Sequence, residues 1–203
     1  MKRDLKLFLI VLWLTSNLIG DLSFAREVLK SSPSPAPKII IVDPPQDLET
    51  CFSPDMPCNE KLVQFILSTK CSLDIAIYDL TDKNIANAIV KIAEAKISPC
   101  LVRIVVDQIQ SIKLYSQISY LKSKGIAIKS GKQNKLMHNK FMIQDGKMLE
   151  TGSFNYSVNA SKFNQENQVY LAHPTIVSAY KKRFESMWEK ANPWTAPKKT
   201  KPL

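Results

Sequence analysis

The chain has 203 residues, of which 28 are Lys or Arg and 18 are Asp or Glu, so its formal net charge is +10. This length suits a single globular domain. The five glycines form neither a dinucleotide-binding G-x-G-x-x-G pattern nor a Walker A loop, because the Gly-Lys pairs at 131–132 and 146–147 lack the Ser or Thr that must follow. With two histidines and neither a C-x-x-C nor an H-E-x-x-H pattern, we predict no metal site and no cofactor.

Residues 1–25 have the pattern of a secretory signal peptide. A basic start precedes an apolar run that is too short to span a bilayer, and Ser23 and Ala25 occupy the small-residue positions before a cut at Arg26. We therefore expect an exported protein, periplasmic or secreted, and an uncleaved membrane anchor is the alternative. Most of the basic excess lies after residue 25, where it favours either solubility or binding to a polyanion.

After a Ser/Pro-rich linker at 26–38, we expect one folded domain at 39–192 and a basic tail at 193–203. The first part of the domain alternates strands and helices, as βαβ units do. The expected strands are 39–43, 73–78, 101–107 and 126–128, and the expected helices are 59–67 and 83–96, the second opened by Asp82. An amphipathic stretch is expected between 108 and 121.

All four cysteines lie in the part of the chain that is expected to be exported, where disulfides persist. Cys51 and Cys58 flank a short Pro-containing segment and are natural partners. Cys71 and Cys100 precede two expected strands and can bridge if those strands are parallel neighbours. Four cysteines allow three pairings, and four free thiols are the alternative.

The second part of the domain predicts a β-hairpin. The runs 138–144 and 147–151 flank Asp145-Gly146, a dipeptide typical of two-residue hairpin turns. A strand is expected at 168–172, and after it a helix with Pro174 in its first turn. Together the elements predict an α/β fold in which a mixed β-sheet is sandwiched between helices.

Two pairs of polar residues are predicted to meet beside this hairpin. Alternate residues of a strand point to one face, so His138 and Lys140 place an imidazole beside an ammonium. Ser153 and Asn155 follow the hairpin with the same spacing, and strand pairing folds them back beside the first pair. This set forms an anion site in which Lys140, Ser153 and Asn155 can bind the phosphate of a phosphodiester without a metal.

The order His138-x-Lys140, Asp145 and Gly152-Ser153-x-Asn155 resembles the H-K-D motif of the phospholipase D superfamily. The likeness covers residues 48–190, and most of it is similar to the small bacterial endonucleases of that superfamily. The exported front end and the segment 51–58 look more like the rickettsial-type phospholipases D. The resemblance implies a phospholipase D-like fold with one motif per chain.

The resemblance also implies a two-step reaction. One motif histidine attacks phosphorus, a second protonates the leaving oxygen, and water then cleaves the phosphohistidine. The chain holds one motif, and His173 has no Lys two residues later, so we interpret it as a structural or capping residue. The second histidine must then come from another copy, and we expect a homodimer with the active site and both His138 rings at the two-fold interface.

Two acidic residues complete the set of candidate catalytic residues, which is His138, Lys140, Asp145 and Glu166. Glu166 occupies the place where the family's endonucleases carry a carboxylate that orients the nucleophilic histidine, and a solvated side chain is the alternative. Asp145 belongs to the signature, yet the hairpin turn puts it about 17 Å from Lys140 at ~3.3 Å per residue. We therefore expect it to support the turn and the scaffold, and leave a direct chemical role open.

These observations predict a metal-independent phosphodiester hydrolase. The first hypothesis is a non-specific endonuclease for DNA or RNA, because a short basic domain leaves an open groove for a polyanion. The second is an exported phospholipase D that hydrolyses head groups at a phospholipid membrane, since basic residues also meet anionic lipids. A third, a non-catalytic nucleic-acid-binding module, has no need of an imidazole at position 138.

Overall fold

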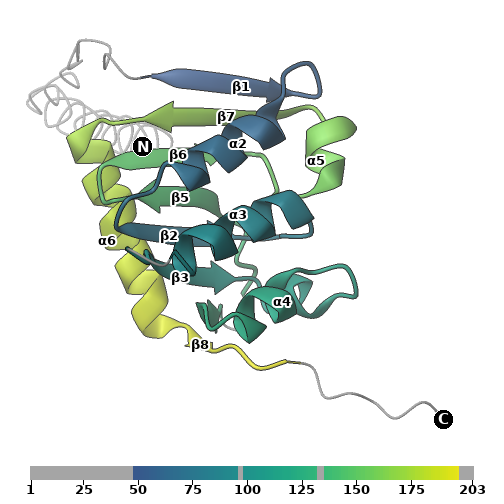
Figure 1. Cartoon of the computed structure of the whole chain (residues 1–203), viewed down its shortest axis with the longest axis vertical. Helices are drawn as coiled ribbons and strands as arrows, with labels where there is room; N and C mark the ends of the chain where they lie inside the picture. Colours follow the sequence, from purple (N-terminus) through teal and green to yellow (C-terminus); the bar gives the residue numbers. More distant parts are fainter. Residues whose placement is uncertain (1–47, 96–97, 132–134, 197–203) are drawn as a thin grey trace, which may run out of the picture. The chain divides into compact units, whose positions relative to one another are not determined.

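The computed structural model describes residues 48–95, 98–131 and 135–196. In this part of the chain, eight strands form one mixed sheet in the order β1-β7-β6-β5-β2-β3-β4-β8. Helices α2, α3 and α4 pack on one face and α6 packs on the other (Figure 1). The α/β fold with a mixed sheet between helices is thereby confirmed. The signal peptide, the linker and the strand expected at 39–43 lie outside the described residues.

The strands are β1 (Glu49–Ser53), β2 (Ser72–Ile77), β3 (Leu101–Val106), β4 (Ala127–Ser130), β5 (Lys140–Gln144), β6 (Met148–Gly152), β7 (Glu166–Leu171) and β8 (Asn192–Pro193). The helices are α2 (Cys58–Leu67), α3 (Lys83–Ala93), α4 (Ile118–Ser123), α5 (Val158–Lys162) and α6 (Pro174–Lys190), with a 3-10 turn at Gln110–Ile112. Within the described ranges, no helix is both long and apolar enough to cross a bilayer.

Most expected elements are present, and the differences occur where the sequence pattern is short or interrupted. The strand β1 and the helix α5 were not expected, because five residues are too few for a helical or strand periodicity to show. The amphipathic stretch at 108–121 is divided into the 3-10 turn and α4, because Lys113 between them has an extended backbone. The helix α3 ends at Ala93, three residues before its expected end.

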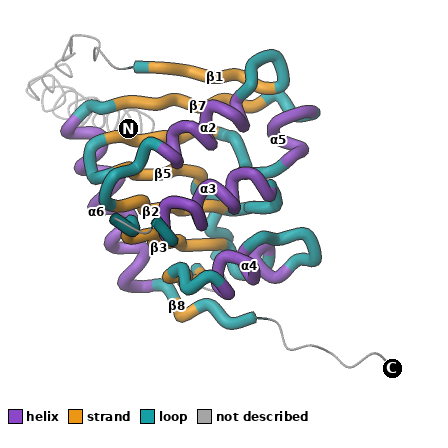
Figure 2. The backbone as a smooth tube through the Cα atoms, viewed as in Figure 1, coloured by secondary structure: helices purple, strands orange, loops and turns teal. Residues whose placement is uncertain are grey.

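The strand directions bring several strand ends to one edge of the sheet. The strands β2 and β3 are parallel, and β5 runs antiparallel to both β2 and β6. The strands β6 and β7 are also antiparallel. Consequently β2, β3 and β6 end where β5 and β7 begin, and we call this end of the sheet the site edge (Figure 2).

The two helices that follow the first strands are joined through one buried carboxylate. Asp82 is the N-cap of α3 and accepts hydrogen bonds from the backbone N–H groups of Asn84 and Ile85. Its other oxygen accepts a 2.8 Å hydrogen bond from the amide of Asn59 on α2. This carboxylate therefore fixes both the start of α3 and its position against α2.

A network of charges fastens α6 to the opposite face of the sheet. The guanidinium of Arg103 on β3 binds Asp74 on β2 at 2.8 Å and Glu185 on α6 at 2.7 Å. It also lies over the rings of Phe184 and Trp188. The hydrogen bonds that Arg103 donates to Asp74 and then to Glu185 raise the pKa of Arg103, so the cation that joins two strands and a helix is permanent.

The folded unit extends past residue 192. Asn192 and Pro193 pair with β4, and the Trp194 side chain is buried. The indole N–H of Trp194 donates a 2.9 Å hydrogen bond to the hydroxyl of Ser111. Residues 193 and 194, which were expected to belong to a basic tail, are thus part of the fold, and Pro193 belongs to β8, the outermost strand next to β4.

The cysteines are only partly paired. Cys51 and Cys58 form the expected disulfide. Cys71 and Cys100 directly precede the parallel neighbours β2 and β3, as expected, but the bridge considered between them is not formed. The Cys71 side chain is exposed, whereas the Cys100 thiol is buried and contacts the backbone carbonyl of Thr69 at 3.7 Å.

This pairing predicts the thiol count of the purified protein. Unfolded without reductant and treated with iodoacetamide, the protein should gain two adducts, on Cys71 and Cys100, and peptide mapping should recover Cys51 joined to Cys58. A product without any adduct would show that β2 and β3 are bridged after all.

A buried acid lies in the core of the sheet. Glu150 on β6 is fully enclosed, and its Oε2 accepts a 2.9 Å hydrogen bond from the Tyr156 hydroxyl. Its Oε1 has no partner among the described residues, nor has the amide nitrogen of Gln168 on the neighbouring β7. Burial raises the pKa of Glu150 to about 8, against the smaller opposite effect of the Tyr156 hydroxyl.

Stability should therefore depend on pH through Glu150. Between about pH 4.5 and pH 8 its carboxyl is ionised in the unfolded chain but protonated in the folded one, so the free energy of unfolding should fall as pH rises. The slope from this one group is up to ~1.4 kcal/mol per pH unit. Denaturant titrations at pH 5 and pH 8 should show a smaller pH effect for Glu150→Gln than for the wild type. Equal pH effects in both proteins would contradict this assignment.

Candidate active site

The predicted His-Lys pair lies at the site edge. Lys140 is the first residue of β5 and pairs with Ile77, the last residue of β2. The His138 side chain is exposed, whereas that of Lys140 is buried. The Lys140 ammonium lies 3.4 Å from each ring nitrogen of His138 and donates a 3.0 Å hydrogen bond to the His138 carbonyl. The strand expected from residue 138 begins at Lys140, so His138 lies just before β5, and its imidazole is nevertheless beside the ammonium as expected.

An aromatic residue that no sequence motif marks completes this contact. The Tyr78 ring meets the His138 ring edge to face at a centroid distance of 4.4 Å, and the Lys140 ammonium lies 5.3 Å from the Tyr78 centroid. The Tyr78 hydroxyl accepts a 2.6 Å hydrogen bond from the side chain of Gln110. Tyr78 therefore fixes the orientation of the imidazole. In sequence it was only the last apolar residue of an expected strand.

The electrostatic environment of Lys140 suits an anionic ligand. Burial lowers the pKa of its ammonium, and the charge of Glu166 opposes this effect. Glu166 begins β7 and lies on the same face of the sheet as Lys140, with Gly152 of β6 between the two strands. A partly desolvated cation without an ion pair in the described ranges attracts an anion more strongly than a cation in water does.

Ser153 and Glu166 are held together directly. The Ser153 hydroxyl donates a short hydrogen bond to Glu166 and accepts one from the backbone N–H of Asn167 at 3.1 Å. The Glu166 carboxylate also accepts a 3.0 Å hydrogen bond from the side chain of Asn164. Within the described part of one chain, Glu166 makes no hydrogen bond to His138, so its expected role in orienting a histidine remains a proposal.

Asn155 lies at the same edge, in the segment after β6, which hydrogen bonds attach to the segment after β2. The next residue, Tyr156, bridges to Leu80, and its carbonyl accepts hydrogen bonds from the N–H groups of Thr81 and Asp82. These bonds attach the segment after β6 to the segment after β2, which follows Tyr78. The Asn155 Oδ1 is buried without a hydrogen-bond partner among the described residues. An amide oxygen only accepts hydrogen bonds, so the side-chain nitrogen of Asn155 is the atom that can donate to a phosphate.

Asp145 and His173 lie away from this cluster. Asp145 is in the hairpin turn at the other end of β5, where both it and Gly146 have positive φ. Its carboxylate accepts hydrogen bonds from the N–H groups of Lys70, Cys71 and Ser72, the last of which begins β2. Burial would raise the pKa of Asp145, but these three donors outweigh it and lower the pKa. His173 occupies the N-cap position of α6 and makes no side-chain cap hydrogen bond.

A second acid that the sequence did not reveal holds the segment before His138. Asp107 follows β3, and one of its oxygens accepts hydrogen bonds from the N–H groups of Ile109 and Gln110. Its other oxygen accepts one from the N–H of Met137 at 3.2 Å. Asp107 therefore positions both Gln110, which binds Tyr78, and the residue that precedes His138.

Gly152 allows β6 and β7 to approach closely beside Ser153. A Cβ atom at position 152 would lie 2.0 Å from the Asn167 carbonyl oxygen, which accepts the 3.1 Å hydrogen bond from the Ser153 N–H. Any side chain here must push the two strands apart at the point where Ser153 and Glu166 meet.

We therefore expect Gly152→Ala to lower both stability and activity. The forced separation should cost about 1–3 kcal/mol in denaturant unfolding and should reduce phosphodiesterase turnover at temperatures where the variant is folded. Gly125→Ala is the control. It is strained by a φ of +79° but meets nothing within 4 Å, so it should lose stability while retaining turnover. Wild-type turnover in folded Gly152→Ala would contradict this account.

The described residues hold no group of three or more His, Cys, Asp or Glu side chains that could bind a metal ion. The cluster instead supplies an exposed imidazole as a nucleophile or base, a buried ammonium and two neutral polar side chains. This combination can bind a phosphodiester and place its phosphorus beside a ring nitrogen.

Comparison with known proteins agrees with this arrangement. The family model of the cardiolipin synthase, PLD-like domain matches residues 62–188, which include strands β2 to β7, the His-Lys pair and most of α6. The chain belongs to the phospholipase D superfamily, and it is a phosphodiesterase of that superfamily.

Relatives in the superfamily have different substrates in their names. The chain is 33% identical over 172 residues to the mitochondrial cardiolipin hydrolase of Xenopus laevis, covering 84% of this chain and 80% of that protein. It is 29% identical over 134 residues to the phospholipase D of Rickettsia prowazekii (strain Madrid E), covering 66% and 64%. Among solved structures, it is similar to Nuc from Salmonella typhimurium, a phospholipase D family member, with a TM-score of 0.67, 25% identity and coverage of 74% and 99%.

Proposed function

We propose that the protein is a metal-independent endonuclease that cleaves DNA or RNA through a phosphohistidine at His138. The observation that carries this proposal is the exposed imidazole beside the desolvated Lys140 ammonium at an open edge of the sheet. The basic chain suits a polyanion, and a strand of nucleic acid can reach an edge site from solvent.

In the first chemical step, a ring nitrogen of His138 attacks phosphorus and the bond to the leaving oxygen breaks. A second histidine donates a proton to that oxygen, and the 3′ or 5′ portion of the strand leaves as an alcohol. Lys140 and Asn155 bind the non-bridging oxygens, where negative charge increases in the transition state. In the second step, water gives its proton to the second histidine and its oxygen to phosphorus, which breaks the P–N bond and restores both rings.

The second histidine comes from a second copy of the chain in this proposal. His173, the other histidine in the sequence, begins α6, which follows β7 at the edge opposite to His138. A two-fold dimer would bring the two exposed His138 rings together and form one site from two chains. Glu166 would then orient a ring at this shared site, with Ser153 and Asn164 holding its carboxylate in place.

Phospholipid head-group hydrolysis is the second candidate, and a specific observation favours it. Large apolar side chains are exposed on loops that adjoin the site edge: Leu114, Tyr115, Leu136 and Phe163 are 65% to 87% exposed. Such side chains can enter the interfacial region of a membrane, where a lipid phosphodiester would meet Lys140. The frog and rickettsial relatives, by their names, also act on lipids.

Plasmid cleavage in excess EDTA tests the first candidate. The mature chain, residues 26–203, should nick supercoiled plasmid, and His138→Ala should lose at least 1000-fold in rate, on the order of the cost of removing a nucleophile. The solution mass of the active species should be that of a dimer. Nicking by His138→Ala, or full activity in a monomer, would contradict the mechanism.

A liposome assay with the same two proteins separates the candidates. An inactive plasmid assay together with His138-dependent release of head groups from anionic vesicles would replace the endonuclease by the phospholipase. Cleavage of the plasmid without release of head groups from the vesicles would support the endonuclease.

A further inference from the structure

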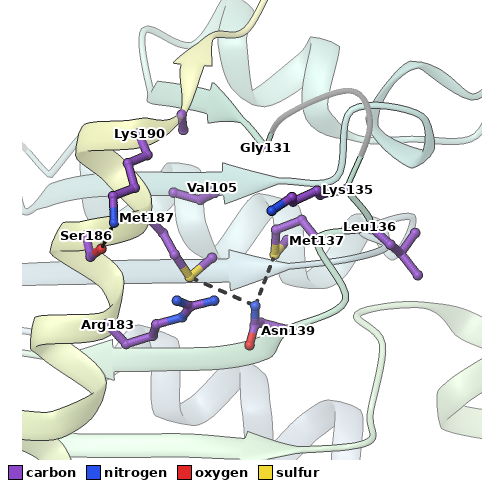
Figure 3. Close-up of a pocket in the computed structure, with 11 residues that line it drawn as sticks. Val105, Gly131, Lys135, Leu136, Met137, Asn139, Arg183, Ser186, Met187 and Lys190 are labelled. Carbon is purple, nitrogen blue, oxygen red and sulfur yellow. Dashed lines mark hydrogen bonds between the residues drawn. The ribbon is translucent and has the colours of Figure 1, made fainter.

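A basic groove lies on the face of the sheet opposite to Lys140, beside the same strand. It is a cavity of about 330 Å³ between the second half of α6 and the segment 135–139 (Figure 3). Its main lining side chains are Lys135, Met137, Asn139, Arg183, Met187 and Lys190. We call this cavity the α6 groove.

The charge of the α6 groove has one sign. Among the residues that the structure describes, three cations line it and no Asp or Glu does. Within the described ranges, Lys135 and Arg183 have no hydrogen bond or ion pair, and the Lys190 ammonium donates only to the hydroxyl of Ser186 at 2.9 Å. Elsewhere on α6 the protein pairs charges, as Glu185 does with Arg103. The unpaired cations therefore favour an anionic ligand in the groove.

Asn139 connects the α6 groove to the candidate active site. It stands between His138 and Lys140 in the chain, and the alternation of side chains turns it to the α6 face. Its amide nitrogen contacts the sulfur atoms of Met137 and Met187 at 3.6 and 3.9 Å, as Figure 3 shows. The amide oxygen has no hydrogen bond in the described part of the chain, so it remains free to accept one from a ligand.

We propose that the α6 groove binds the phosphate of a nucleotide next to the scissile one, with Arg183 as its main ligand. This inference rests on the proposed function and extends it, because it names single-stranded nucleic acid as the substrate. In this proposal, a phosphodiester chain bound at Lys140 passes around the site edge at Asn139, whose side chain lines the groove together with Arg183 and Lys135. The thioethers of Met137 and Met187 offer an apolar floor to a sugar or base.

The groove favours a nucleic acid over a lipid with one phosphate. Such a lipid has its only phosphodiester at the scissile position, so a second cationic site would have nothing to bind. A strand of nucleic acid brings further phosphates, and each contact with Arg or Lys adds affinity that falls with salt. A guanidinium is suited to this task because its planar donors bind two phosphate oxygens at once.

Binding of a fluorescent single-stranded oligonucleotide tests this inference without requiring cleavage. The parent protein is the full mature chain with His138→Ala, into which Arg183→Gln or Lys182→Gln is introduced. Lys182 is an exposed neighbour on α6 that does not line the groove, so its variant is a matched control for the loss of one charge. Arg183→Gln should weaken binding about tenfold and lower the slope of log affinity against log salt by about 1, while Lys182→Gln should change both less.

Activity on a small substrate controls for damage to the active site. In the wild-type background, Arg183→Gln should leave hydrolysis of bis(p-nitrophenyl) phosphate unchanged, because that substrate has no second phosphate, and should raise the KM for oligonucleotides. The inference would be overturned if Arg183→Gln and Lys182→Gln weakened binding equally. It would also be overturned if the parent protein did not bind the oligonucleotide at all. Arg183-dependent binding to cardiolipin vesicles in place of the oligonucleotide would also overturn it and assign the groove to a lipid with two phosphates. A wild type that binds through Arg183 yet never cuts would refute the proposed endonuclease and retain the groove.

Discussion

The mechanism that we propose depends on the desolvated ammonium of Lys140. This ammonium contacts both nitrogens of the His138 ring and lies over the ring of Tyr78. The carboxylate whose charge acts on it, that of Glu166, already accepts hydrogen bonds from Ser153 and Asn164. A cation removed from water and not neutralised by a salt bridge is prepared for a phosphate. The ring beside it is then at the right place to attack that phosphate.

The rest of the fold holds this ammonium at one edge of the sheet. Pairing of β5 with β2 sets Lys140 opposite Ile77, and Gly152 allows β6 and β7 to come close enough for Ser153 to reach Glu166. Two aspartates act as backbone anchors, Asp145 at the far end of β5 and Asp107 after β3. The chemistry of the site is carried by a few side chains, whereas its geometry is fixed mainly by main-chain hydrogen bonds.

Sequence alone predicted the features that follow from local spacing. Alternation along a strand placed His138 beside Lys140, and the Asp145-Gly146 turn put Asp145 away from them. The contributions of Tyr78 and Asp107 could not be predicted, because each depends on a partner distant in sequence: the ring of His138 for one and the N–H of Met137 for the other. The unbonded state of Cys71 and Cys100 likewise depends on side-chain direction, which register alone does not determine. The burial of Trp194 could not be predicted either, because the prolines and lysines around it are typical of an unstructured tail.

Trapping the covalent intermediate is the most direct test of this account. An oligonucleotide with a single radioactive phosphate, in excess over wild-type protein, should be quenched in alkali during the first turnover, and the labelled protein should be mapped by peptide mass spectrometry. Label should appear on His138, with a maximum of one label per two chains, because two rings share one site in the proposed dimer. Label on another residue, label on both chains of a dimer, or cleavage that proceeds without labelled protein would contradict it.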